Sequence, residues 1–308
     1  MRIKVILNPC ADLGHGISKK EIIISEGEKW GGLDLVLTDH QGHACQLARE
    51  AAAEGYDVIV AAGGDGTVHD IVNGMLQDGK PQSKLGVIPL GTGNDFAYSV
   101  GASLEVPIAV ENIFRGDNRS IDLAEIVDGR GIHKLFANIL GIGFDANVVI
   151  RVQAITSLRG FPKYLWGVLK TLMLDFWPFQ FDMHFDDEQL KQDVLFVAFG
   201  VGRRHGGGFM LTPDALLDDN KIDTCTVRPM GRLRALMLLN SAVKGTHTKE
   251  PQVTMRQSKR IEISCKGSLP IHIDGEVFAY PHDNVQRVTI TSMPAAIEVM
   301  VQEGSAKD

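Results

Sequence analysis

A glycine-rich stretch, Gly63-Gly64-Asp65-Gly66-Thr67, follows an apolar run and precedes apolar residues at helical spacing. This order predicts a strand, a tight turn and the start of a helix. Such a turn lets backbone N–H groups approach a phosphate closely, and the helix dipole adds a favourable field. The carboxylate of Asp65 would repel a bare anion, so we expect it to meet phosphates through Mg²⁺ or to order water.

A second glycine turn, Gly91-Thr92-Gly93, follows the expected strand Leu85–Ile88 and leads into Asn94-Asp95-Phe96-Ala97. Because the carboxyl ends of neighbouring parallel strands meet at one edge of a sheet, we expect the two turns to lie close together. Phosphoryl transfer needs cradled phosphates, a divalent cation and a group that orients the attacking hydroxyl. The two turns could supply the cradle.

The orienting group is expected near the end of the chain, in Ile273-Asp274-Gly275-Glu276. The pattern predicts a strand that ends in a turn and projects a carboxylate. By the family resemblance described below, Glu276 is the candidate general base for a hydroxyl. Since a hydroxyl is far more basic than a carboxylate, this base would take the proton late and would also orient the oxygen. The alternative is a hairpin turn with a solvated glutamate.

Residues 1–121 alternate segments of strand character with segments of helical character. The clearest expected helices are Gly42–Glu54 and Val106–Phe114. Alternation of this kind predicts a parallel sheet with helices on both faces, and hence an α/β domain that positions both glycine turns. The expected strands are Ile3–Leu7, Leu33–Leu37, Val58–Ala62 and Leu85–Ile88.

Residues 122–293 follow a different pattern, in which short alternating segments predict an antiparallel β domain. Two helices are expected to interrupt it, within Pro162–Phe176 and Leu233–Val243. The last segment, 294–308, could return to the first domain through a strand at Ala296–Val301. The other expected strands are Ser120–Val127, Lys134–Leu140, Gln180–Phe185, Asp193–Val201, Ile222–Val227, Lys259–Ser264, Ile271–Ile273 and Gln286–Thr291.

Net charge, cysteine spacing and the lengths of the apolar runs exclude some classes of protein. The 308 residues carry a formal charge of −7, which argues against a broad nucleic-acid-binding surface. The four cysteines are scattered without a C-x-x-C pair, which favours reduced thiols in a cytoplasm. The chain opens on a strand rather than a signal peptide, and its apolar runs are shorter than the ~18 residues that span a bilayer. We expect a cytoplasmic protein whose membrane contact is peripheral.

The turns Gly63–Thr67 and Pro89–Ala97, together with Asp274-Gly275-Glu276, resemble the diacylglycerol kinase catalytic family, which includes bacterial lipid kinases and the sphingosine and ceramide kinases. The first turn also occurs in NAD kinases and, in similar form, in phosphofructokinases, whereas the second is much more specific. The resemblance covers nearly the whole chain. It implies a Rossmann-like, phosphofructokinase-like α/β domain, then a β-sandwich-like domain, with the active site in the cleft between them.

The resemblance implies ATP and Mg²⁺ as cofactors and assigns residues to the nucleotide site. It places Asp65 beside the ATP phosphates and their Mg²⁺, and Asp95 and Asp122 in a water network along the cleft. From residue type alone, Asp95 could instead cap a helix, Asp122 could be a solvated strand carboxylate, and His69 and His43 read as packing residues. The loop Cys10–Gly16 departs from the short Ser-Gly form of the family. The implied nucleotide-site residues are Asn8, Thr38, Gly63, Gly64, Asp65, Gly66, Thr67, Val68, His69 and Thr92.

The segment Arg203–Asp223 resembles a family loop that carries a structural Mg²⁺ in bacterial members. The matching ligands here are the main-chain carbonyls of Leu216 and Lys221 and the carboxylate of Asp219. Asn220 replaces the usual glycine, and asparagine tolerates the left-handed conformation better than most residues. An acidic surface turn without metal is the alternative. The ten histidines show no ligand spacing to one another, so the sequence indicates no histidine metal site.

The sequence therefore predicts an ATP- and Mg²⁺-dependent kinase that phosphorylates a lipid hydroxyl, with conversion of diacylglycerol to phosphatidic acid as the first candidate reaction. An NAD kinase and a catalytically inactive nucleotide or lipid sensor are the alternatives. The expected partner is a lipid presented at a membrane surface and met transiently at its inner face. The aromatics and lysines of Phe161–Lys170 could lie at that surface or line an acyl groove, whereas core packing is the favoured reading for most of the rings. Both a monomer and a homodimer stay open.

Overall fold

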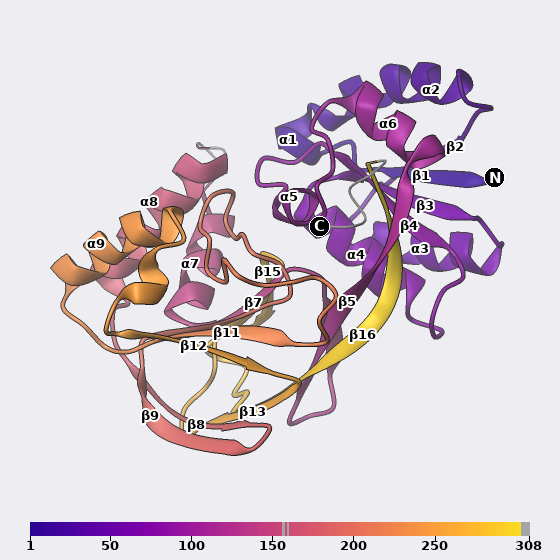
Figure 1. Cartoon of the computed structure of the whole chain (residues 1–308). Coiled ribbons are helices and arrows are strands. Elements are labelled where there is room, and N and C mark those ends of the chain that lie inside the picture. Colours follow the sequence, from indigo (N-terminus) through magenta and orange to yellow (C-terminus); the bar gives the residue numbers. More distant parts are fainter. Residues whose placement is uncertain (156–157, 159, 303–308) are drawn as a thin grey trace. The chain divides into compact units, whose positions relative to one another are not determined.

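The computed structural model describes residues 1–155, 158 and 160–302. The chain divides into two compact units, Met1–Asp122 with Pro294–Asp308 and Leu123–Met293 (Figure 1). The sequence pattern placed the boundary one residue earlier, and the tail 303–308 lies outside the described residues. Strands β5 (Asp117–Asp128) and β16 (Arg287–Val301) each run from one unit into the other.

The first unit is built on a parallel sheet in the order β2-β1-β3-β4, and the end of β16 pairs with β4 through Val299 and Leu85. Its strands are β1 (Ile3–Leu7), β2 (Asp34–Leu37), β3 (Val58–Gly63) and β4 (Lys84–Pro89). Its helices are α1 (Ala11–Gly14), a 3₁₀ turn (Gly16–Lys19), α2 (Lys20–Glu28), α3 (His43–Ala53), α4 (Asp65–Met75), α5 (Asp95–Ser99) and α6 (Val106–Arg115).

Burial explains why these segments form these elements. Every residue of β3 is buried, as expected for a central strand covered on both faces. Helix α6 buries Val106, Ala109, Val110 and Ile113, which recur every three or four residues and form one apolar stripe. A proline near its first turn fits the helix start, where an N–H would lack a helical partner.

The second unit contains two antiparallel arrangements. In one, the strand order is β16-β13-β8-β9, and the first part of β16 makes the contact with β13. Strand β5 also pairs with β16, and β6 pairs with β5. The other is a six-stranded sheet in the order β12-β11-β10-β7-β14-β15. The strands are β6 (His133–Phe136), β7 (Ile139–Gly143), β8 (Phe179–Phe185), β9 (Glu188–Val194), β10 (Phe196–Gly200), β11 (Ile222–Val227), β12 (Val253–Ser258), β13 (Arg260–Cys265), β14 (Ile271–Ile273) and β15 (Glu276–Ala279).

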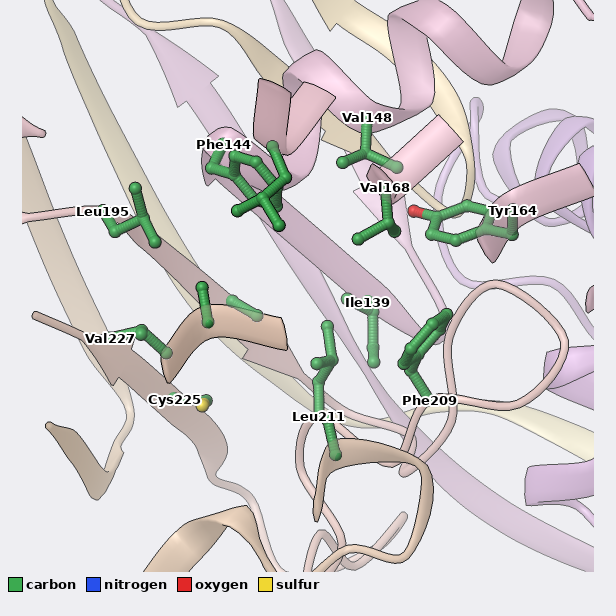
Figure 2. Close-up of a cluster of buried hydrophobic side chains, with 14 of the residues drawn as sticks. Ile139, Phe144, Val148, Tyr164, Val168, Leu195, Phe209, Leu211, Cys225 and Val227 are labelled. Carbon is green, nitrogen blue, oxygen red and sulfur yellow. The ribbon is translucent and has the colours of Figure 1, made fainter. Parts of the chain in front are cut away.

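Three helices pack in this second unit: α7 (Phe144–Gln153), α8 (Gly160–Leu174) and α9 (Arg232–Val243). Side chains from α7 and α8 point toward those of the strands and of the loop at Leu211, and together they form a buried apolar cluster (Figure 2). Among the helices of the described residues, none is long and apolar enough to cross a membrane.

Four expected strands were wrong in detail. The expected strand Lys134–Leu140 is two strands, because backbone N–H groups at the break bond to a side chain, Asp274, instead of to a ladder. The expected strand Asp193–Val201 breaks at Leu195, whose N–H donates to the Val227 carbonyl. The last two expected strands are one continuous β16. Helix α7 was not expected, because its short apolar run does not distinguish helix from strand.

Candidate active site

The first glycine turn closes strand β3 and opens helix α4, as expected from the sequence. A Cβ on Gly63 would overlap the side chain of Thr67, so this position admits only glycine without rearrangement. The Thr67 hydroxyl oxygen accepts a hydrogen bond from Asn8 Nδ2 at 3.1 Å. Asn8 follows β1, and its own N–H donates to the Ala62 carbonyl at 2.9 Å. Asn8 and Thr67 therefore join the ends of two neighbouring strands at the turn.

The second glycine turn lies directly against the first. A Cβ on Gly64 would lie 3.1 Å from the α-carbon of Gly91, and a Cβ on Gly91 would overlap Gly64. Leu90 N–H donates to the Gly63 carbonyl at 2.8 Å, which fixes the two chain segments together. The amide side chain of Asn94 closes the second turn through bonds of 2.9 and 2.8 Å to the Gly91 backbone. The surface between the turns is thus backbone, the form that suits close approach of a phosphate.

Asp65 occupies the first position of helix α4, and its Oδ1 accepts a hydrogen bond of 2.9 Å from the Phe96 amide. It therefore caps helix α5, which begins after the second turn. From residue type alone, Asp95 could have been the residue that caps this helix. In the structure Asp95 is a buried residue in the first turn of α5. The Asp65 carboxylate therefore fixes the second turn and α5 against the first turn, and it does so with or without a bound cation.

The other residues assigned to the nucleotide site are placed as follows. Thr38 is buried at the end of β2, and its N–H donates to the Leu7 carbonyl. Thr92 is exposed in the second turn. Gly66 is partly exposed in the first turn of α4, where an amide has no partner within the helix. The side chains of Val68 and His69 are buried, and the Val68 amide donates to Gly64, so neither side chain is presented to a ligand there.

Asp122, expected as a cleft or solvated carboxylate, is 3% exposed. Its Oδ1 accepts a bond of 2.8 Å from the Ala295 N–H. Ala295 has a positive φ of 48°, a strained value for a residue with a side chain. The Asp122 carboxylate thus holds an irregular point of β16 inside the first unit.

Gly91→Ala is expected to weaken nucleotide binding about tenfold or more. The added methyl group would overlap the Gly64 backbone, which cannot rotate away as a side chain could. Overpacking costs about 1–3 kcal/mol, and 1.4 kcal/mol is tenfold in affinity. Calorimetric titration with an ATP analogue measures the change. Gly231→Ala is the control, because a Cβ there meets no atom within 4 Å. Unchanged affinity in Gly91→Ala would contradict a phosphate site at these turns.

Glu276, the candidate base, is the partly buried first residue of β15 in the second unit. Its turn is fixed by Asp274, whose carboxylate accepts backbone N–H bonds from Ala137, Asn138 and Ile139 at 3.0, 3.0 and 3.1 Å. Asp274 itself has a positive φ of 50°. Sequence reasoning quoted Asp274 but gave it no role. The three bonds make it the residue that positions Glu276.

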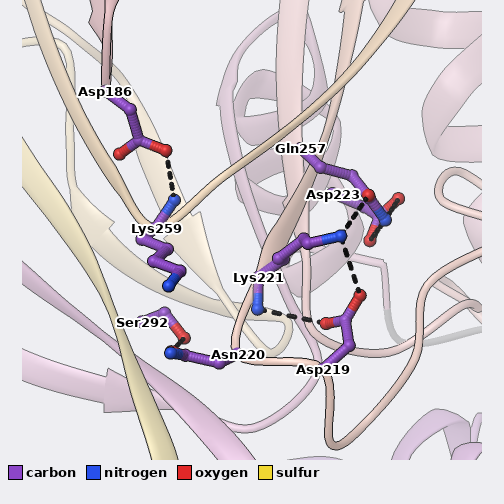
Figure 3. Close-up of polar contacts among 8 residues, drawn as sticks. All are labelled: Asp186, Asp219, Asn220, Lys221, Asp223, Gln257, Lys259 and Ser292. Carbon is purple, nitrogen blue, oxygen red and sulfur yellow. Dashed lines mark hydrogen bonds and ion pairs between the residues drawn. The ribbon is translucent and has the colours of Figure 1, made fainter.

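The loop expected to hold Mg²⁺ is shown in Figure 3. Asn220 has φ of 57°, so asparagine does adopt the left-handed conformation that glycine would, and its Oδ1 accepts from Ser292 at 3.1 Å. Oδ1 of Asp219 accepts the Lys221 N–H at 3.0 Å, while Oδ2 lies 4.0 Å from the Lys221 ammonium. Burial, with Asp219 and Asp214 adding to it, raises the pKa of Asp223 to about 6. The oxygen ligands of this loop are of the type that binds a divalent cation. The Lys221 ammonium would compete with such a cation for the Asp219 carboxylate.

A partly open apolar pocket, with a cavity volume of about 60 Å³, lies in the second unit among α7, α8, α9 and strands of the six-stranded sheet. The few polar side chains that reach it are Asp145, Tyr164, His205 and His247. Its apolar lining includes Val168, Leu172, Leu195, Phe209 and Leu211, several of which are drawn in Figure 2.

Sequence reasoning missed the polar cluster at this cavity. His205 and His272, 67 residues apart in the chain, both lie beside the Asp145 carboxylate. Burial alone would raise the pKa of the Asp145 carboxyl, but the neighbouring His272 and His205 lower it below its ordinary value. No spacing rule could have joined these residues, because they come from a helix, a loop and a strand.

Two family models match the chain. The diacylglycerol kinase catalytic domain matches residues 2–126, and the YegS C-terminal NAD kinase beta sandwich-like domain matches residues 138–301. A diacylglycerol kinase from Mycobacterium tuberculosis is 30% identical over 304 residues, which cover 97% of this chain and 94% of that protein. The chain belongs to the diacylglycerol kinase family. It is therefore a lipid kinase, and membership of a kinase family implies that it uses ATP.

Other relatives agree with this assignment. Diacylglycerol kinases from Bacillus subtilis and Staphylococcus aureus are 28% and 30% identical to the chain, and the matches cover 89% of it and 89% and 86% of those proteins. The crystal structure of a diacylglycerol kinase from Bacillus anthracis shares the fold, with a TM-score of 0.73 at 21% identity and coverage of 98% and 97%. The α/β-plus-β fold and the lipid kinase activity predicted from the sequence are confirmed.

Proposed function

We propose that this lipid kinase transfers the γ-phosphoryl group of ATP to the hydroxyl of diacylglycerol and so makes phosphatidic acid. The observation that carries the proposal is the backbone contact between Gly64 and Gly91, because it forms one glycine-lined phosphate cradle from two strand ends. The names of the relatives from Mycobacterium tuberculosis and Bacillus subtilis support diacylglycerol as the acceptor.

In this reaction the acceptor oxygen forms a bond to the γ-phosphorus, and the bond from that phosphorus to the bridging oxygen of ADP breaks. The first-turn amides of α4, including that of Gly66, bind the phosphates. Glu276 orients the acceptor hydroxyl and takes its proton late, as negative charge leaves the oxygen. Asp274 holds Glu276 in place through the 137–139 backbone.

We further propose that Mg²⁺ takes part. When bound, it would neutralise charge on the transferring phosphates. Asp65 is the acid within the first glycine turn, and its Oδ1 already caps α5. A second Mg²⁺ would be held by Asp219 with the carbonyls of Leu216 and Lys221, in place of the Lys221 ammonium.

We propose that the apolar cavity of the second unit receives an acyl chain of the lipid. Apart from His247 and the cluster near Asp145, its walls are hydrocarbon and aromatic. Each CH₂ group transferred into such a site contributes about 0.8 kcal/mol, so burying even part of an acyl chain there would add to binding.

Ala235→Phe is expected to lower kcat/KM for long-chain diacylglycerol at least tenfold and to affect short-chain diacylglycerol little. Ala235 on α9 is 7% exposed and lines the cavity, so a phenyl ring there would occupy chain space. Leu236→Phe is the matched control, because Leu236 is the next residue of the same helix and is 40% exposed. Assays with di-C8 and di-C18 substrates compare the variants. Equal losses on both substrates would argue against an acyl site.

We also propose that helices α8 and α9 contact an anionic membrane surface. Arg232 Nε donates to the Leu172 carbonyl at 3.0 Å, so the two helices lie side by side (Figure 1). Met173 and Leu233 are 75% and 73% exposed, and Trp166 and Met237 are also exposed. Both helices carry basic residues and no carboxylate. Exposed apolar side chains combined with positive charge suit anionic lipid.

Met173→Asp combined with Leu233→Asp is expected to reduce binding to phosphatidylglycerol vesicles at least tenfold. The charges would remove apolar insertion and repel the anionic surface. Leu104→Asp is the control, because Leu104 is 69% exposed in the first unit. Vesicle sedimentation measures binding, and phosphatidylcholine vesicles test the charge requirement. Equal binding by the double variant and the control would contradict this docking surface.

The proposed function is tested by incubating the purified protein with labelled ATP, Mg²⁺ and a panel of lipids in mixed micelles. Label is expected in phosphatidic acid, to disappear with EDTA and to return with added Mg²⁺. Label in another lipid would support a lipid kinase but would identify a different acceptor. Label in NADP from added NAD, with none in any lipid, would favour an NAD kinase. Nucleotide or lipid binding without turnover would favour an inactive sensor.

A further inference from the structure

Three buried side chains of the second unit bring metal-ligating atoms together: Asp145 on α7, His205 in the loop after β10, and His272 on β14. Their ligand atoms all lie within 4.8 Å of one another. His272 Nε2 is 2.9 Å from Asp145 Oδ2, and His205 Nε2 is 3.8 Å from Asp145 Oδ1. A fourth donor, the Tyr164 hydroxyl, contacts His205 Nε2. All four donors are nitrogen or oxygen atoms.

The cluster is removed from water, and the backbone leaves room for it. His205, His272 and Asp145 are 3%, 0% and 7% exposed. A Cβ on Gly141 would overlap both Asp145 Oδ2 and His272 Nε2, so glycine at this position of β7 is what admits the two donors. The imidazole rings of His205 and His272 are nearly parallel, with centroids 4.6 Å apart, and their Nε2 atoms both face the same carboxylate.

We propose that Asp145, His205 and His272 bind a divalent transition-metal ion, with Zn²⁺ as the first candidate and Tyr164 or an exogenous oxygen as the fourth ligand. Two imidazoles and one carboxylate are a common protein donor set for zinc and for ferrous iron. Tetrahedral zinc with N and O ligands at about 2.0–2.2 Å spaces its donors about 3.3–3.5 Å apart. The observed separations of 2.9 and 3.8 Å lie on either side of that spacing.

Without a cation, two imidazoles share one buried carboxylate, which also interacts with the Tyr164 hydroxyl. A buried network in which several groups share one acceptor is costly. A bound cation would give both Nε2 atoms and the carboxylate a common ligand. It would also tie α7, the His205 loop and β14 together, two residues before Asp274.

Zinc binding is measured by elemental analysis of the full-length protein after equilibration with limiting Zn²⁺ and a micromolar-affinity chelator. We expect one Zn²⁺ per chain. His272→Gln and His205→Gln should each weaken affinity at least 100-fold. The control is His40→Ala with His43→Ala, which removes the exposed Asp39–His40–His43 group of the first unit. That double variant should retain the ion.

Co²⁺ substitution supplies a readout that does not depend on enzyme activity. The wild-type protein should give the intense visible absorption of four-coordinate Co²⁺, and Tyr164→Phe, which keeps the ring packed, should shift that band if the hydroxyl is a ligand. Zn²⁺ should also raise the melting temperature of wild type and not of His272→Gln. The proposal is overturned if the chelator removes all zinc from wild type, or if the His40/His43 variant alone loses it. If His272→Gln misfolds, the zinc stoichiometry and the Co²⁺ spectrum of the wild-type protein still test the proposal.

Discussion

Glu276→Gln is expected to lower kcat for lipid phosphorylation roughly 10²–10⁴-fold and to leave ATP affinity unchanged, because the loss of a general base has this size. Glutamine has the shape of glutamate and can keep the contact that Glu276 makes with Gln153 at 3.5 Å, so the fold should persist. What it lacks is the ability to take a proton from the acceptor hydroxyl. Turnover with labelled ATP and diacylglycerol measures the effect, and calorimetry measures ATP affinity.

Glu262→Gln is the matched control for this experiment. Glu262 lies on β13 of the same unit and pairs with Arg260 at the surface, at 2.8 Å. Exposed ion pairs contribute little, so kcat should stay within about twofold of wild type. If Glu276→Gln keeps wild-type turnover, Glu276 is not the base, and the carboxylates of the first unit become the candidates.

Asp274→Asn is expected to destabilise the protein by about 1–3 kcal/mol and to lower kcat at least tenfold, with the KM for ATP unchanged. Asparagine tolerates the positive φ of 50° at this position, so the turn itself survives. Its amide NH₂, however, cannot accept from a backbone N–H, and the 137–139 segment loses one of its bonds. Glu276, two residues later, should then be held less firmly.

Asp186→Asn is the control that separates an effect on the position of Glu276 from a general loss of stability. Asp186 also has a positive φ and also accepts two backbone N–H bonds, from Lys259 and Arg260 at 2.9 Å each. Figure 3 shows the bond from Lys259. Asp186→Asn should destabilise the protein, measured by urea unfolding, by less than Asp274→Asn, because Asp186 is exposed and water can replace the lost bond. It should leave kcat unaltered at temperatures where both variants are folded. Equal kcat for the two variants would reduce Asp274 to a structural residue.

Local sequence patterns predicted the parts of the site that are local in the chain. The strand, glycine turn and helix at Gly63–Thr67 lie within a few residues of one another, and so do Ile273 and Glu276. Side-chain partners were not predictable, since Asp65 caps a helix 31 residues away and Asp274 bonds a backbone 135–137 residues away. Such pairs are set by tertiary packing, which leaves no periodicity in the sequence.

The same distinction explains the errors in the second unit. The sequence pattern predicted β6 and β7 as one strand because residues 135–140 are apolar except for Asn138, and the distant Asp274 carboxylate divides them. The histidines near Asp145 read as unrelated for the same reason. In the first unit the four parallel strands and the two helices whose bounds were predicted, α3 and α6, were found to within one residue at each end, because each βα segment is a short-range pattern.

Strand β16 gives the protein a particular order of assembly during synthesis. The first unit includes Pro294–Asp308, and Val299 pairs with Leu85, so this unit lacks an edge strand until the last residues have been made. About 170 residues separate its two pieces. At roughly 5–20 residues per second, the nascent α/β sheet must wait about 10–30 seconds for its final strand. Truncation just before Pro294 should therefore yield a chain whose unpaired β4 is prone to aggregation, even though every residue of both glycine turns is present.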